Sequence, residues 1–319
     1  MAILHNAVAR LWTKRVLTLA ISLIAVLTLS FLMIQLIPGD PVRMALGPDA
    51  PASLVEERRI QLGLDQPLYL QYLNYWKAVL TGQLGSSIIT GQPVSLIIES
   101  RLGNTVLLVI ASLSATMLLS IIVGIVIGII THGGKRPTAR FSFNFFSGFA
   151  GALPEFLIAV ALVYFFAVTI KIFPVAGAAG PLSFVLPATA ITLGSAATMM
   201  RIVRSSTATV LDQDYILVAR SKRLPRARIY LRHALPNLLT AALTLGGLQL
   251  GAIVTGTIVV ENVFAIPGLG TALVNALITR DFPVAQILML IFASSVLILN
   301  LFIDILLTVL DPRSTLQEA

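Results

Sequence analysis

Long apolar runs separated by shorter polar connections dominate the sequence. Six runs are long enough to cross a bilayer, at residues 16–37, 105–131, 141–170, 182–200, 238–260 and 284–310. A helix needs about 20 apolar residues to cross a hydrocarbon core of about 30 Å. The runs lack the strict alternation of barrel strands, and helices satisfy their own backbone hydrogen bonds in lipid. The pattern therefore predicts an all-α integral membrane protein with six transmembrane helices.

Composition supports a membrane location and removes several kinds of site. The 319 residues are 57% hydrophobic and 11% charged, with a mean hydropathy of +0.93, outside the range of soluble domains. The absence of cysteine excludes disulfides, thiolate metal sites and cysteine nucleophiles. His5, His132 and His233 are far apart in the sequence, so no metal site is predicted. The net charge of +8 comes without stacking aromatics or a nucleic-acid motif, so no nucleic-acid partner is expected.

Lysine and arginine are unevenly distributed among the connections, and this asymmetry predicts the orientation. Cytoplasmic loops carry the excess of basic residues. With the N-terminus inside, 15 of the 22 lysines and arginines fall on the cytoplasmic side. Five more lie in a long outer loop, which the rule largely exempts. We therefore expect both termini in the cytoplasm, an N-terminal helix with an outer loop over 1–103, and a transmembrane core over 104–319.

The segment 201–232 is basic and polar in an otherwise lipophilic chain. It holds eight basic residues against Asp212 and Asp214. Residues 214–220 predict a short helix with an acid in its first turn, which the helix dipole favours. Pro225 is expected to break it, and a second helix over 226–235 is expected to stop near Pro236. Such a hairpin could be gripped by a partner protein, or the charge could be a positive-inside anchor attracted to anionic lipid.

Several short motifs follow one another along nearly the whole chain. Those in the basic segment are Asp214-Tyr215, Ala219-Arg220-Ser221-Lys222 and Arg232-His233-Ala234-Leu235 before Asn237. The others are Pro38-Gly39-Asp40-Pro41, Leu62-Gly63-Leu64-Asp65, Glu261 with Phe264, Pro267-Gly268-Leu269-Gly270, Arg280-Asp281 and Asp311-Pro312-Arg313. Together these motifs resemble those of permease subunits of ABC importers in the dipeptide, oligopeptide and nickel class.

The resemblance implies a six-helix type I importer permease fold with a large extracytoplasmic loop between the first two helices. It also implies a place in the bacterial inner membrane beside a second permease subunit, two ATP-binding cassette subunits and an extracytoplasmic solute-binding protein. A coupling segment at 201–236 would contact the ATPases. Its implied contact residues are Asp214, Tyr215, Ala219, Arg220, Lys222, Arg223, Arg232 and His233.

Two positions depart from the family pattern. Arg223 stands where the family has glycine in the coupling turn, and Ala241 stands where it has proline. Glycine adopts a positive φ freely, whereas arginine does so only at a cost. The sequence also lacks a Gly-x-x-x-x-Gly-Lys-Ser/Thr phosphate loop, so ATP with Mg²⁺ is expected on separate subunits, and this chain is expected to be non-catalytic and to bind no cofactor.

Glu155 is a charged residue inside the third apolar run, beside Pro154. Such residues face a cavity or a partner because a charge in the bilayer is costly. Glu155 could contact substrate in the translocation pathway, or it could be a structural carboxyl at a helix break. A secondary transporter driven by an ion gradient is the alternative function, but it predicts an inverted repeat and several intramembrane acids. The sequence leaves the transported solute open.

Overall fold

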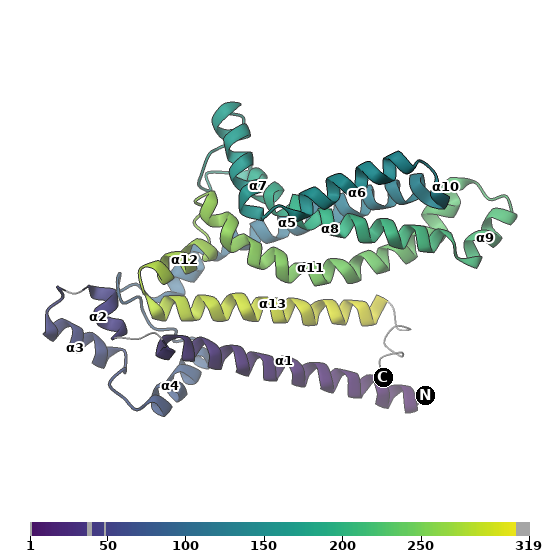
Figure 1. Ribbon diagram of the computed structural model, residues 1–319. Coiled ribbons are helices and arrows are strands. Elements are labelled where there is room, and N and C mark those ends of the chain that lie inside the picture. Colours follow the sequence, from purple (N-terminus) through teal and green to yellow (C-terminus); the bar gives the residue numbers. More distant parts are fainter. Residues whose placement is uncertain (1, 37–39, 48, 311–319) are drawn as a thin grey trace.

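The computed structural model describes residues 2–36, 40–47 and 49–310, and this part of the chain is helical without strands. Long helices run along one another with shorter helices at both ends (Figure 1). Helix α8 packs against α5 and α11, and α13 packs against α11 and α1. The long helices are α1 (Ala2–Leu36), α5 (Val94–Thr131), α8 (Val185–Leu211), α11 (Leu235–Val263) and α13 (Phe282–Leu310).

The predicted all-α membrane fold is confirmed, although the spans differ in detail. By length and composition, four described helices can cross a membrane, and five can if the bent pair α6 and α7 counts as one span. Within α11, the stretch Gln249–Val263 is a shorter apolar helix. Some predicted features lie outside the described residues. They are the end of the first run at Ile37, Pro38 and Gly39 of the outer-loop motif, and the motif Asp311-Pro312-Arg313.

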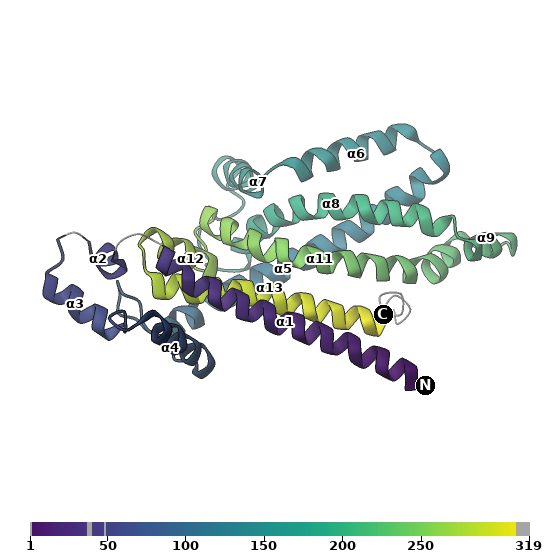
Figure 2. The same cartoon turned by 60° about the horizontal axis from the view of Figure 1, so that its bottom comes forward.

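The predicted span over 141–170 is broken at Pro154. Helix α6 (Pro137–Ala152) and helix α7 (Glu155–Leu162), which η2 (Val163–Thr169) continues, meet at a bend of 96°. Leu153 is extended, with ψ of 128°, because a residue before proline avoids the helical region. Glu155 thus stands in the first turn of α7. Figure 2 shows α6 lying alongside α8 and α7 at its far end.

The helix of the fourth predicted span extends beyond the end of the apolar run at residue 200. Helix α8, entered through η3 (Pro181–Phe184), continues to Leu211, so the first third of the basic segment is helix and not loop. Charge ended the apolar run, but residues 201–211 contain no proline or glycine to end the helix. The hairpin therefore begins at Asp212.

The second predicted hairpin helix does not stop near Pro236. Helix α10 (Arg226–Arg228) passes through a π-helical turn, η4 (Ile229–Ala234), directly into α11. Pro236 lies in the first turn of α11. Proline is tolerated there because the π-helical turn directly before it already interrupts the regular i→i−4 hydrogen bonding. The hairpin is thus joined to the bundle by helix on both sides.

Two glycine pairs bring helices of this one chain into close contact. A Cβ atom at Gly124 would lie 2.7 Å from Cβ of Val203, and one at Gly128 would lie 2.6 Å from Cβ of Thr207. These glycines let α5 and α8 approach. Gly247 and Gly251 of α11 similarly face Ile303 and Val296 of α13. Both glycine pairs therefore pack helices within the chain.

The outer loop is mostly helical and leans against the bundle at one end (Figure 1). The Tyr72 hydroxyl lies 2.8 Å from Thr28 Oγ1 of α1, and the Tyr75 hydroxyl lies 2.7 Å from Ser30 Oγ of α1. Burial raises the pKa of Tyr75, and the hydrogen bond with Ser30 works against that rise. The loop contains α2 (Pro41–Leu46), α3 (Ala52–Gln61) and α4 (Leu68–Thr81).

Candidate functional site

The hairpin at residues 212–235 projects from the end of the bundle opposite the outer loop (Figure 1). Its first arm is α9 (Asp214–Ser221), with Asp214 in the first turn as predicted. Ile216 and Ala219 are buried in a cluster with Leu211, Ile229 and residues at the start of α11. The apolar face of α9 is thus packed against the return arm, so the hairpin is a compact unit with its own core.

Arg223 adopts the left-handed conformation that the family's glycine would favour. Its φ is 52°. The Arg223 N–H donates to the Arg220 carbonyl at 2.9 Å, and the Leu224 N–H donates to the Ala219 carbonyl at 3.4 Å. This pair of bonds is a Schellman motif, which usually has glycine at the position that Arg223 holds. The turn keeps its shape, and arginine bears a conformational cost of about 1–2 kcal/mol.

Tyr215 and Asn237 join the first arm of the hairpin to the start of α11. Asn237 Nδ2 donates to the Tyr215 hydroxyl at 2.8 Å and to the His233 carbonyl at 3.2 Å. Tyr215 lies on α9, and Asn237 lies in the first turn of α11. Both residues belong to the motifs that carry the family resemblance, and their spacing is explained by this contact.

The predicted contact residues separate into two groups. Ala219 is buried within the hairpin, and His233 is half-buried. Asp214, Tyr215, Arg220, Lys222, Arg223 and Arg232 are exposed. Exposed apolar side chains accompany the charges, with Leu217, Val218 and Leu231 about half or more exposed at 49%, 53% and 66%. The surface of the hairpin therefore mixes apolar area with positive charge.

His132 holds the base of the hairpin to the connection between α5 and α6. Its Nε2 lies 2.7 Å from Oδ1 of Asp212, directly before α9. Residue His132 begins η1 (His132–Gly134). No sequence pattern indicates this pair, because 80 residues separate the two side chains.

A buried carboxylate organises the other end of the core. Glu261 is fully buried, and its Oε1 accepts from Thr105 Oγ1 at 2.6 Å. Its Oε2 accepts from the backbone N–H of Gly270 at 2.7 Å and of Thr271 at 3.2 Å. These N–H groups open helix α12 (Leu269–Ile278), whose dipole favours a carboxylate there. Glu261 therefore fixes the α11–α12 connection onto α5.

The glycines of the Pro267–Gly270 motif make this contact possible. A Cβ atom at Gly268 would overlap the Glu261 carboxylate, and one at Gly270 would lie 2.8 Å from Oε2 and 2.6 Å from Cα of Ile258. The motif therefore provides close backbone approach, and Asn104 adds a hydrogen bond of 2.9 Å from Nδ2 to the Pro267 carbonyl.

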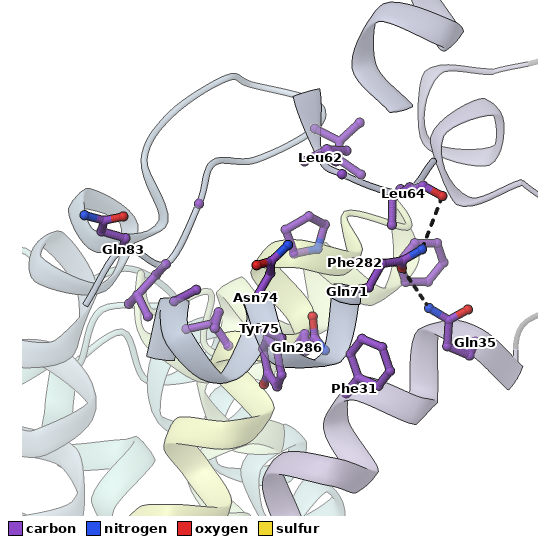
Figure 3. A pocket seen from close by; sticks show the side chains of 17 residues that line it. Phe31, Gln35, Leu62, Leu64, Gln71, Asn74, Tyr75, Gln83, Phe282 and Gln286 are labelled. Carbon is purple, nitrogen blue, oxygen red and sulfur yellow. Dashed lines mark hydrogen bonds between the residues drawn. The ribbon is translucent and has the colours of Figure 1, made fainter. Parts of the chain in front are cut away.

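Asp281 connects the core to the outer loop. Its Oδ1 accepts from the Ile88 N–H at 3.1 Å, and its Oδ2 accepts from the Ser87 hydroxyl. Close by, α4, α1 and α13 surround a cavity of about 240 Å³ (Figure 3). Carboxamides face it, and Gln71 Nε2 donates to the Leu64 carbonyl at 3.3 Å. The amides that line it are Gln35, Gln71, Asn74, Gln83 and Gln286.

Glu155 lies between α8 and α11. Its Cγ is 3.4 Å from the position that a Cβ atom would take at Gly194, and a Cβ at Gly256 would overlap its Oε2. Among the described residues, none donates a hydrogen bond to the carboxylate of Glu155. Across all the residues that the structure describes, no group of three histidine, aspartate or glutamate side chains could hold a metal ion.

Comparisons with known proteins agree with the geometry. Residues 124–316 match the family model for the binding-protein-dependent transport system inner membrane component, and residues 8–109 match the N-terminal model for the membrane component of these systems. The chain is 37% identical over 301 residues to the glutathione transport system permease protein GsiC of Escherichia coli strain K12, covering 94% of this chain and 96% of that protein. It is 36% identical over 299 residues to the GsiC protein of Salmonella typhimurium strain LT2, with the same coverage.

These matches favour the importer over an ion-gradient-driven transporter. Their length covers both the outer loop and the core, so the similarity is not confined to one motif. The chain belongs to the family of inner-membrane components of binding-protein-dependent transport systems, and it is a non-catalytic permease subunit of an ATP-driven ABC importer.

Proposed function

We propose that this subunit carries small peptides of the glutathione class across the inner membrane after an extracytoplasmic binding protein delivers them. The support is the name of the relatives, which are glutathione permeases aligned over 94% of this chain. The proposed partners are a second permease subunit and two ATP-binding cassette subunits, which would hold ATP with Mg²⁺. The sequence has no phosphate loop, so the energy must come from such subunits.

The hairpin at residues 212–235 is the proposed coupling element that docks the ATPases. The observation that carries this proposal is the hydrogen bond of 2.8 Å between Tyr215 and Asn237, which ties α9 to the start of α11. A force applied to α9 would move α11 with it instead of bending a loop. The exposed Arg220, Lys222 and Arg223 suit an acidic or polar partner groove, and Leu217 and Val218 supply apolar contact area.

This role requires the hairpin to lie on the cytoplasmic side. The first turns of α1 and the last turns of α13 lie at the same end of the bundle as α9 (Figure 1). That arrangement supports the predicted orientation, in which both termini are cytoplasmic. It also accounts for the concentration of basic residues at that end.

Charge reversal at Arg220 and Lys222 together tests the coupling proposal. In proteoliposomes holding the whole transporter, the double variant R220E/K222E should hydrolyse ATP without substrate-dependent stimulation and should lose most uptake. The matched control R43E/K77E reverses two exposed charges of the outer loop and should keep both coupling and uptake. Normal uptake in the hairpin variant, with the complex intact by size-exclusion chromatography, would refute the proposal.

Substrate class is tested separately from coupling. With the binding protein supplied outside, glutathione should stimulate ATP hydrolysis by the reconstituted wild-type transporter, and free amino acids should not. Stimulation by dipeptides or a nickel complex, with none by glutathione, would contradict the proposed class but leave the permease assignment untouched.

Glu155 is the proposed pathway residue, because its carboxylate lies between α8 and α11 without a partner among the described side chains. The variant E155Q should lower uptake while leaving assembly with the ATPases unchanged. Equal uptake in E155Q and wild type would favour a purely structural carboxyl at the break before α7.

A further inference from the structure

A basic cavity lies at the base of the hairpin, between the α5–α6 connection and the hairpin's two arms. Its volume is about 580 Å³. Four basic side chains line it, from His132, Lys135, Arg136 and Arg220. No aspartate or glutamate is among its described lining residues. Asp212 is nearby, but its Oδ1 is engaged by His132 at 2.7 Å. Like charges facing one cavity repel each other, so the site favours an anion.

The backbone holds Arg136 at this cavity in a costly conformation. Its φ is 51°, in the left-handed region, and it follows Gly133 and Gly134, whose φ values are 68° and 74°. A non-glycine residue in this region costs about 1–2 kcal/mol. Strained residues of this kind cluster where they contact a ligand. Three successive or nearly successive residues with positive φ, Gly133, Gly134 and Arg136, thus direct the α5–α6 connection past the cavity.

The other wall of the cavity is apolar and lies at the end of a membrane span. Ile129 and Ile130 are in the last turn of α5, within the apolar stretch Val94–Gly134, and Ile229 and Tyr230 face them from the hairpin. A cavity with hydrocarbon on one side and guanidinium groups on the other matches an amphipathic anion. A soluble anion has no apolar part that could contact the apolar wall.

We propose that this cavity binds the phosphodiester headgroup of an anionic phospholipid from the inner leaflet. Lys135, Arg136 and Arg220 would contact the phosphate, with arginine providing paired N–H donors. The acyl chains would leave along the apolar end of α5. Basic pockets at the cytoplasmic ends of membrane helices suit such headgroups. The inference rests on the proposed function for the cytoplasmic placement of the hairpin, and it adds a lipid bridge between Arg220 and the bundle.

Lipid retention by the 319-residue chain measures this directly. The protein is purified in mild detergent, exchanged into nanodiscs with defined mixtures of phosphatidylglycerol and phosphatidylcholine, and the bound lipid is counted by native mass spectrometry after release. Wild type should retain phosphatidylglycerol preferentially. The variant K135Q/R136Q should retain it about 30-fold more weakly, since each basic contact near an anionic surface contributes about fivefold. The exposed Arg140 is absent from the cavity lining, so R140Q is the matched control and should behave as wild type.

A second variant separates binding from folding. Glycine suits a φ of 51°, so R136G should be at least as stable as wild type, yet it should bind phosphatidylglycerol about fivefold more weakly. An equal loss in R140Q would show general surface attraction and would overturn the proposal. Displacement of the lipid by inorganic phosphate, or by the ATPase subunits, would overturn it in favour of a soluble anion or a protein contact. Because the lipid count does not depend on ATP, a failure of the coupling proposal would leave this result unchanged.

Discussion

The buried Glu261 carboxylate is expected to be a main determinant of the stability of the outer end of the core. The substitution Glu261→Ala removes both oxygens and leaves the N–H groups of Gly270 and Thr271 without an acceptor inside the protein. Leaving a buried donor unsatisfied costs about 1–3 kcal/mol. Two such donors predict a loss of about 2–6 kcal/mol in the free energy of unfolding, before any cost of the cavity is added.

The substitution Glu261→Gln should be much milder. A glutamine can keep its oxygen on the two backbone N–H groups and turn its NH₂ toward Thr105 Oγ1. The Thr105 hydroxyl, which donates to Glu261 at 2.6 Å, then loses its acceptor. One lost hydrogen bond predicts a change of about 0.5–1.5 kcal/mol. The expected order of stability is therefore wild type, then E261Q, then E261A.

Equilibrium unfolding of the purified chain in mixed micelles, with increasing mole fraction of dodecyl sulfate, measures this order. The control is Glu99→Ala, which removes an exposed carboxylate of α5 and should change stability by less than about 0.5 kcal/mol. If E261A unfolded at the same mole fraction as E99A, the hydrogen bonds of Glu261 would contribute nothing measurable. Glu261 would then not stabilise the start of α12 through the N–H groups of Gly270 and Thr271.

Two further predictions follow from packing and from pH. Gly128→Ala should destabilise the chain by about 1–3 kcal/mol, because the new Cβ atom would lie 2.6 Å from Cβ of Thr207. The control Gly148→Ala should not destabilise it, because a Cβ atom there has no neighbour within 4 Å. Equal unfolding of the two variants would contradict the α5–α8 contact. Burial raises the pKa of Tyr75 above its ordinary value of about 10. The folded chain therefore keeps the Tyr75 proton to a higher pH than the unfolded chain. The protonated phenol thus stabilises the fold below about pH 10, and this stabilisation is lost as the pH rises further. Thermal unfolding at pH 8 and pH 10.5 should show a smaller decrease for Tyr75→Phe than for wild type; equal decreases would rule out this assignment.

Hydropathy located the membrane helices but not their breaks and extensions. The run 141–170 is mostly apolar on both sides of the break, yet the helix turns by 96° at Leu153–Pro154, because backbone sterics at a proline act independently of hydropathy. In the opposite direction, Arg201 and Arg204 ended the apolar run although α8 continues to Leu211. Charged residues are acceptable in a helix that leaves the membrane, so the end of an apolar run does not mark the end of a helix.

Long-range polar pairs were beyond reach of the sequence. Glu261 and Thr105 are 156 residues apart, and no periodicity relates them. The motif resemblance did point to the right segment for the hairpin, and the turn at Arg223 kept the shape expected for glycine. It could not show that Ala219 is buried while its neighbour Arg220 is exposed, because that division depends on how α9 packs against Ile229.

Helix α11 runs from the hairpin to the end of the bundle that carries α12. Helix α11 has 29 residues, or about 43 Å at 1.5 Å per residue, and polar contacts fix it at both ends. Asn237 binds Tyr215 of the hairpin at its start, and Glu261 binds the first turn of α12 near its end. A displacement of the hairpin would therefore shift α11 as one rigid helix. That shift would reach the contact between Glu261 and the first turn of α12. Glu155 lies against Gly256, in the last third of α11, and against Gly194 of α8, so sliding of α11 past α8 would change the space around its carboxylate.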